Sequence, residues 1–162
     1  MDTITDILKK TVNSDALIIE PVNDAELKKC DIDLSDIGLL PLPAGYVQFL
    51  KLANGYAWNG FEFFGTYTCT EKATGYTLSD IVGFNEQIRE KKGYSDDILV
   101  LGRFDEDIYI YNYTEESYKA IDRLTSIEAD EFDSFEDLIL STVGLYVDSD
   151  DGDGYDDYDE DD

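Results

Sequence analysis

The stretch from Leu39 to Gly60 constrains the fold more than any other part of the chain. Its apolar residues recur at positions i, i+3, i+4 and i+7, namely Tyr46, Phe49, Leu50 and Ala53. This spacing predicts a helix with one stripe facing the core. Pro43 suits the first turn of that helix, because its missing N–H would have no partner there. Asn54-Gly55 is expected to end the helix, with Gly55 in the left-handed conformation.

Other helices are predicted towards both ends of the chain. Apolar spacing and capping residues indicate helices over 4–12, from Asn23 to about Cys30, over 80–92 with Ser79 as cap and Gly93 as stop, and from Ser134 to Gly144.

Strands are predicted in the middle of the chain, where short apolar runs alternate with turn residues. The runs are Phe61–Phe64 after the turn Asn59-Gly60, Ile98–Leu101, Ile108–Asn112 and the region from Tyr118 to Ile121. A turn is expected from Gly102 to Asp107. Strands joined by such short loops favour an antiparallel meander, and together with the flanking helices they predict an α+β fold.

The length and composition predict one folded domain followed by an acidic tail. A chain of 162 residues with 43% hydrophobic residues can bury a single core. We expect this domain to span residues 1–147 and the tail, residues 148–162, to be disordered. The tail holds ten acidic residues and no basic ones. It also has EF-hand-like spacing at Ser149, Asp151, Asp153, Gly154 and Glu160, but a solvated acidic tail explains this spacing better than a weak calcium site.

The charge of the chain excludes some partners and favours others. The formal net charge is −26, and without the tail it is still −16. Such a surface repels nucleic-acid phosphates and anionic membranes, and it attracts basic proteins. The chain has no His, which removes the commonest general base and metal ligand. A hydrolase that uses carboxylates alone, such as the pair offered by Asp105 to Asp107, stays a weaker alternative. We therefore expect no enzyme activity, no cofactor and no metal.

The sequence also predicts a cytoplasmic location. Acidic residues stand near the start, where a signal peptide would have a positive region, and no apolar stretch approaches the roughly 18 residues of a membrane span. Cys30 and Cys69 are the only cysteines and are expected to be reduced and partly buried.

The central helix and the strand after it resemble a known family. The string Leu42-Pro43-Ala44-Gly45-Tyr46-Val47-Gln48-Phe49-Leu50, with Asn54-Gly55 and Phe64-Gly65, is similar to the motif of the SUKH superfamily, which includes Smi/Knr-type cell-wall regulators of yeast. Residues 98–102, the strand Tyr109-Ile110-Tyr111, Asp122-Arg123 and the closing helix agree in order with its YrhA-like bacterial branch. The resemblance covers about residues 20–145.

The resemblance implies a curved antiparallel sheet flanked by helices and no catalytic residues. It also implies an immunity protein, which would neutralise a polymorphic toxin domain, in many cases a nuclease, by stoichiometric binding. A scaffold or regulatory domain without a toxin partner is the alternative. No binding residue is carried over from the family, because the toxin-facing surface varies between its members.

Candidate contacts with a basic partner follow from charge and aromatic clustering. Aromatic anchors with a charged rim suit a protein interface. The candidates are Asp105, Glu106, Asp107, Tyr109, Tyr111, Tyr113, Glu128, Asp130, Glu131 and Asp133. A core-facing tyrosine stripe beside a solvated loop would explain the same pattern.

Overall fold

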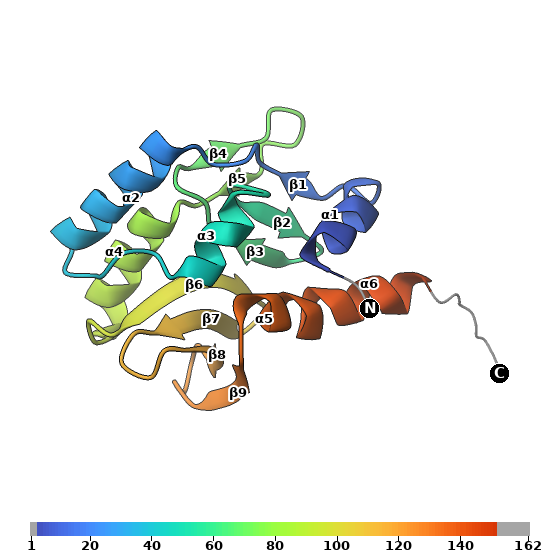
Figure 1. Cartoon of the computed structure of the whole chain (residues 1–162). Helices are drawn as coiled ribbons and strands as arrows, with labels where there is room; N and C mark the ends of the chain where they lie inside the picture. Colours follow the sequence, from blue (N-terminus) through green and yellow to red (C-terminus); the bar gives the residue numbers. More distant parts are fainter. Residues whose placement is uncertain (1–2, 152–162) are drawn as a thin grey trace.

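The computed structural model describes residues 3–151. In chain order the elements are α1 (Ile4–Val12), β1 (Leu17–Ile18), α2 (Asp24–Asp36), α3 (Ala44–Leu50), β2 (Tyr56–Trp58), β3 (Phe61–Phe63), β4 (Cys69–Thr70), β5 (Thr77–Leu78), α4 (Ile81–Lys92), β6 (Ile98–Phe104), β7 (Asp107–Asn112), β8 (Ser117–Asp122), β9 (Glu128–Phe132), α5 (Phe135–Ser141) and α6 (Val143–Asp151) (Figure 1). Seven strands form one antiparallel sheet in the order β1-β2-β3-β6-β7-β8-β9, and β4 pairs with β5. The predicted α+β fold, an antiparallel sheet flanked by helices, is confirmed.

An aromatic cluster joins α3 and α5 to one face of the sheet. Phe135, in the first turn of α5, is its centre. Its ring lies 4.9 Å from Tyr46, 5.1 Å from Phe49, 5.6 Å from Phe63 and 5.8 Å from Tyr118, measured between ring centroids. Aromatic pairs at such distances stabilise a core beyond their buried area. The predicted stripe on the central helix is therefore the link between that helix, the sheet and the closing helix.

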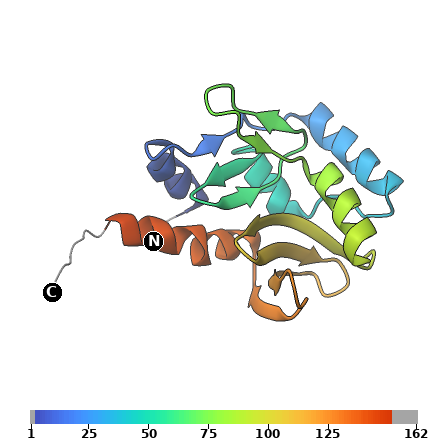
Figure 2. The ribbon, with the colours of Figure 1, turned by 180° about the vertical axis from the view of Figure 1, so that it is seen from behind.

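Helix α4 supplies hydrogen-bond partners for the backbone of β6 where this strand extends beyond its neighbour β3. Asn85 is fully buried and its amide both accepts from the Val100 N–H and donates to the Val100 C=O, each at 2.8 Å. One side chain thus replaces a missing strand at this position. Helices α2 and α4 lie side by side at one end of the molecule, and α1 packs with α5 and α6 at the other (Figures 1 and 2).

Several predicted helix boundaries differ from the structure. Helix α2 continues past Cys30 to Asp36, because Leu34 repeats the buried position of Cys30 one turn later. The cap of α4 is Asp80 and not Ser79, since the Asp80 carboxylate accepts from the Gly83 N–H at 2.8 Å. Helix α3 ends at Leu50, before the predicted stop, and Gly55 has its positive φ of 115° in the following turn.

The closing helix breaks at Thr142 and does not end at Gly144. Helix α6 starts at Val143, whose side chain is buried like that of Val147 one turn later. The backbone of α6 continues to Asp151, beyond the predicted domain boundary at residue 147. Residues 152–162 of the predicted tail, with Asp153, Gly154 and Glu160, lie outside the described residues.

The sheet contains three strands that the sequence patterns did not indicate, namely β1, β2 and β9. Strand β2 pairs with β3 across Asn59-Gly60, where both residues have positive φ, as a two-residue hairpin requires. Strand β9 forms the free edge beside β8. Gly102 belongs to β6 and not to a turn, since it pairs with Phe63 of β3. A glycine is needed there because a Cβ would lie 2.2 Å from the Glu62 carbonyl oxygen. Both cysteines are free, with Cys30 buried and Cys69 half-buried, as predicted.

Candidate protein-binding site

The two acidic segments that the sequence singled out belong to the same side of the sheet, the one formed by β7, β8 and β9. Asp105 and Glu106 form the turn between β6 and β7, and Asp107 begins β7. Strand β9 carries Asp130 opposite Ala120 of β8, and Ala120 in turn lies opposite Tyr109 of β7. Burial, and then the charges of Asp122, Asp105, Asp130 and Glu106, raises the pKa of Asp107 above its ordinary value. Asp107 therefore lies in the electrostatic field of these neighbouring carboxylates.

A pocket of about 530 Å³ opens between this part of the sheet and the junction of α5 with α6. We call it the acidic pocket. The residues that line it include the acids Asp107, Asp130, Glu131, Asp133 and Asp137, and no Lys or Arg is among the described residues that line it. Four of these five carboxylates come from the segments predicted to bind a partner. Asp137 was missed, because its place in the first turn of α5 already explains an acid there.

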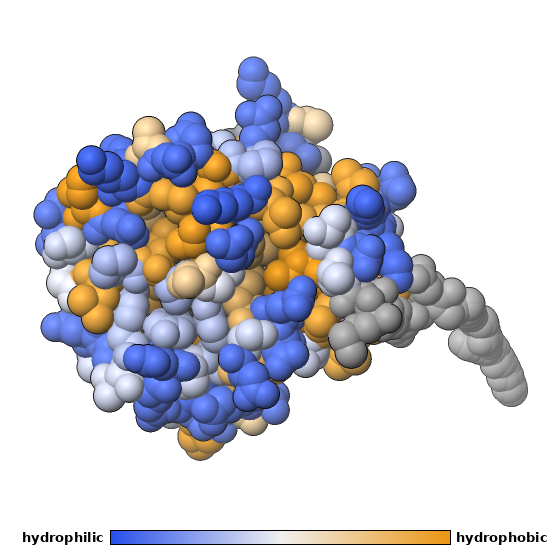
Figure 3. Space-filling model, in the orientation of Figure 1, coloured by the Kyte–Doolittle hydropathy of each residue, from blue (hydrophilic) through white to orange (hydrophobic). Residues whose placement is uncertain are grey.

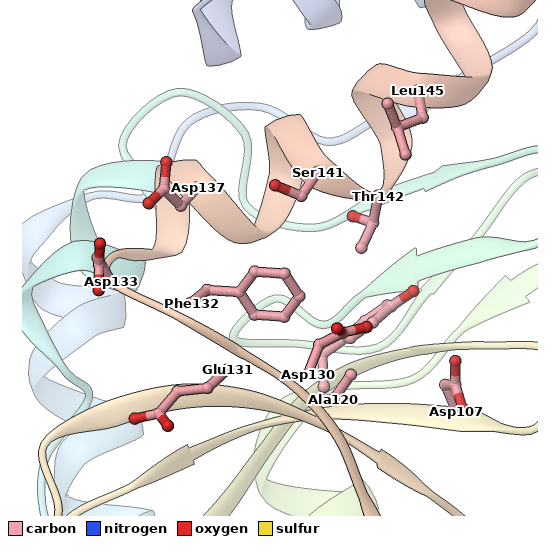
Figure 4. A pocket seen from close by; sticks show the side chains of 11 residues that line it. Asp107, Ala120, Asp130, Glu131, Phe132, Asp133, Asp137, Ser141, Thr142 and Leu145 are labelled. Carbon is pink, nitrogen blue, oxygen red and sulfur yellow. The ribbon is translucent and has the colours of Figure 1, made fainter.

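The close-up shows how the side chains divide around this pocket (Figure 4). Asp130 and Asp107 lie at one end, below Thr142 and Leu145 from the helix junction. Asp133 and Asp137 lie at the other end, near the start of α5. Glu131 points away from Phe132 and Asp130, as expected for the neighbouring residue in a strand. The pocket therefore presents two pairs of carboxylates rather than one compact cluster.

Tyr109 reaches the acidic pocket from the core. Its side chain is 2% exposed and its ring stacks on Phe63 at a centroid distance of 5.5 Å. The residue nevertheless lines the pocket, and its hydroxyl makes no hydrogen bond to the residues that the structure describes. Burial, and then the charge of Asp107, raises the pKa of Tyr109, so the hydroxyl stays protonated at neutral pH. Tyr109 can therefore offer a partner only its hydroxyl and not an aromatic face.

The other two predicted tyrosines lie outside the pocket. Tyr111 packs against Tyr113 at 5.2 Å and against Tyr118 at 4.9 Å, between ring centroids. The Tyr113 hydroxyl donates to the carbonyl oxygens of Leu40 and Pro41, at 2.8 and 3.0 Å. Tyr113 thus ties the segment before α3 to the sheet, which gives it a structural role whether or not a partner touches it.

Glu128 is engaged inside the protein. Lys119 of β8 is 7% exposed, and its ammonium group pairs with Glu128 at 2.6 Å and also with Glu115. The hydrogen bonds that the Lys119 ammonium group donates to Glu115 and Glu128 raise the pKa of Lys119, so both ion pairs persist across the physiological range. Of the predicted acidic contacts on β9, Asp130 is the one that combines a place in the pocket with a free carboxylate near Tyr109.

Exposed apolar side chains beside the acidic residues were not predicted. Leu124 and Ile127, in the turn between β8 and β9, are 64% and 66% exposed, and Leu145 at the pocket is 63% exposed. The Asp122 carboxylate accepts from the N–H groups of Thr125 and Leu124, which fixes this turn and lowers the pKa of Asp122. Apolar anchors within a charged rim are typical of a protein interface.

Two other hollows on the described surface differ from the acidic pocket in their charge. One, of about 420 Å³, lies between α1, α3 and the start of α5 and has no pattern of charge. Figure 3, in the orientation of Figure 1, shows hydrophobic surface gathered over the middle of the molecule and hydrophilic surface around β8 and β9. The other, of about 210 Å³, lies beside α4 and is lined by Lys91, Lys92, Arg103 and Arg123. None of these four bases lines the acidic pocket, although Arg123 lies beside the acidic turn, because its backbone N–H donates to the Glu106 carbonyl oxygen at 2.7 Å.

The comparisons with known proteins add no family. No protein-family model matches the chain, and no curated protein matches it. Within residues 3–151, no helix is both long and apolar enough to cross a membrane, and no three His, Cys, Asp or Glu side chains are placed to hold a metal ion. The SUKH resemblance consequently stays a prediction from the central motif.

Proposed function

We propose that this chain is an immunity protein that binds and neutralises a toxin through the surface around the acidic pocket. The observation that carries the proposal is that Asp107, next to the acidic turn 105–106, and the acidic residues of 130–133 line one pocket that no described base lines. The resemblance of residues 42–65 to the SUKH motif supports the same class of protein. The proposal includes a cytoplasmic protein without catalytic activity.

Charge gives such an inhibitor two advantages. A body with an excess of carboxylates attracts a basic toxin surface over a distance and so speeds encounter. If the toxin is a nuclease, carboxylates held at its cationic site occupy the positions that substrate phosphates would take. Inhibition would then require binding alone, and one protein molecule would block one toxin molecule.

Affinity capture followed by a toxicity assay tests the proposal. The full chain is immobilised, proteins from its native source are captured at low and at physiological salt, and each bound protein is expressed alone in a test bacterium. The proposal predicts a basic protein that stops growth when expressed alone and is harmless when this chain is co-expressed at an equal level.

A charge variant makes the same assay specific to the pocket. Asp130→Asn combined with Asp107→Asn should weaken protection, whereas Glu90→Gln, an exposed site on α4, should protect like the wild type. Capture of a partner that is harmless on its own would favour a scaffold or regulatory role. Protection that is unchanged in the pocket variant would place the interface elsewhere.

A further inference from the structure

Three residues in register across β7, β8 and β9 form the base of the acidic pocket. Tyr109 pairs with Ala120, and Ala120 pairs with Asp130. Neighbouring strands lie about 4.8 Å apart, so Tyr109 and Asp130 stand roughly 10 Å apart on either side of Ala120. Because Ala120 ends at its Cβ, the space above it is open. This opening is deep enough to reach the Tyr109 hydroxyl, which otherwise belongs to the core.

We propose that this opening receives the guanidinium group of an arginine side chain, held by Asp130, Asp107 and the Tyr109 hydroxyl. The identity of the arginine donor rests on the proposed function, since a basic toxin would supply the side chain. The recognition of guanidinium follows from the pocket itself and can be examined without the toxin.

The hydrogen-bonding groups of the pocket fit a ligand that only donates. The carboxylates of Asp107 and Asp130 receive no hydrogen bond from the described residues, and the Tyr109 hydroxyl has both lone pairs free. The Thr142 hydroxyl donates to the Leu138 carbonyl oxygen at 2.6 Å, which leaves its own lone pairs available. An arginine head has five N–H donors and no acceptor, so it can satisfy several such groups at once.

The shape of the pocket favours arginine over lysine. Acceptors lie on both sides of Ala120 and on the helix junction above it, and the planar fork of a guanidinium can address separate walls. A lysine ammonium is a point charge with stronger hydration, so it would reach one wall and lose more solvation. The ring of Phe132 also lies at the pocket, and guanidinium groups pack well on aromatic rings.

A bound cation would also relieve a cost that the free protein carries. Burial, and then the neighbouring acids, raises the pKa of Asp107. A positive group beside Asp107 offsets the repulsion from those neighbouring carboxylates. The unpartnered hydroxyl of the buried Tyr109 gains a hydrogen bond at the same time.

Titration of the full-length chain with N-acetyl-arginine amide tests this inference. Backbone amide shifts measured by NMR should change in β7, in β9 and at residues 141–145, and N-acetyl-lysine amide should bind at least about fivefold more weakly. Asp130→Asn should weaken binding of the arginine probe about tenfold, because the amide oxygen can still accept a hydrogen bond but the negative charge that strengthens it is lost. Tyr109→Phe should weaken it about threefold while the protein unfolds at an unchanged or slightly higher temperature. Glu90→Gln removes one charge on exposed α4 and should bind like the wild type.

Equal affinity for the arginine and lysine probes would overturn the inference, because it would show attraction by charge alone. Shifts at other residues, or displacement of the arginine probe by micromolar calcium, would overturn it as well. The two proposals can fail separately. If a toxin is captured but the chain does not bind the arginine probe, only this inference is contradicted. If the pocket binds the probe but no toxin partner is found, only the proposed function is contradicted.

Discussion

Tyr109 and Asp130 face the same pocket from opposite sides of Ala120, although Tyr109 belongs to the core and Asp130 to the edge of the sheet. The register of three strands, and not a local motif, sets this relationship. Ala120 is 4% exposed, yet its small side chain leaves the pocket open above it. The size of residue 120 should therefore control access to the Tyr109 hydroxyl.

Ala120→Leu should close the acidic pocket. The added side chain extends into open space, so the free energy of unfolding should change by about 1 kcal/mol or less. Binding of the arginine probe should fall below detection. Ala73→Leu, in the exposed loop between β4 and β5, serves as the matched control and should bind normally. Retained binding in Ala120→Leu would mean that the ligand does not enter above residue 120.

Asn85→Ala should destabilise the fold strongly. It would leave the Val100 N–H and C=O without partners in a buried position, and each unsatisfied group costs about 1–3 kcal/mol. We expect a loss of about 2–5 kcal/mol by urea denaturation. Gln87→Ala, on the exposed side of the same helix, should change stability by about 0.5 kcal/mol or less. Equal stability of the two variants would show that water reaches Val100.

Asp107→Asn should stabilise the protein at neutral pH. A folded pKa above the ordinary value of 3.8 means that the folded state holds the proton more tightly than the unfolded state. Stability therefore falls as the pH rises from 3.8 through the folded pKa, and the loss persists at pH 7. Asn carries no charge and avoids this loss. Thermal unfolding of both proteins should show a higher midpoint for Asp107→Asn at pH 7 and no difference at pH 3. A gain at pH 7 no larger than that of Glu90→Gln would count against burial as the cause.

The two cysteines should differ in reactivity. Burial, and then the charges of Asp31 and Asp33, raises the pKa of Cys30 to about 12, so its thiolate is scarce at pH 8. Cys69 is half-buried on the short strand β4. Iodoacetamide should therefore modify Cys69 in the folded protein and Cys30 only after unfolding, as peptide mass spectrometry would show. Similar rates for both thiols would indicate that α2 opens readily.

Much of the fold follows from local patterns. The stripe on 46–53 predicts α3 because four large or apolar side chains share one face, and that face packs on Phe63 and Phe135. The meander of β6, β7 and β8 follows from apolar runs separated by short turns. Strand β9 was not predicted because acids occupy both of its faces, so its sequence shows no alternation of apolar and polar residues.

The acidic pocket could be anticipated only in part. Charge clustering indicated Asp107 and Asp130 separately, but nothing local indicates that they share a pocket. Their placement depends on the register of β7, β8 and β9, in which an irregularity between Ala120 and Ile121 shifts the pairing of β8 with β9. The only local hint of a hollow in this part of the sheet is Ala120, a small residue between the larger Lys119 and Ile121 in β8. The alternation of Tyr109 and Tyr111 fitted either a core-facing stripe or an exposed interaction surface, and the ring of Tyr109 is buried.

The rate of association with the captured partner, measured by stopped-flow at several salt concentrations, tests the central claim most directly. If the acidic surface captures a basic toxin, the association rate should fall steeply as salt rises, because charges more than about 8 Å apart are screened at physiological ionic strength. Replacing Asp105, Glu106 and Asp107 by Lys should slow association at low salt and flatten this dependence. An association rate that does not change with salt, or a partner that is itself acidic, would contradict electrostatic capture.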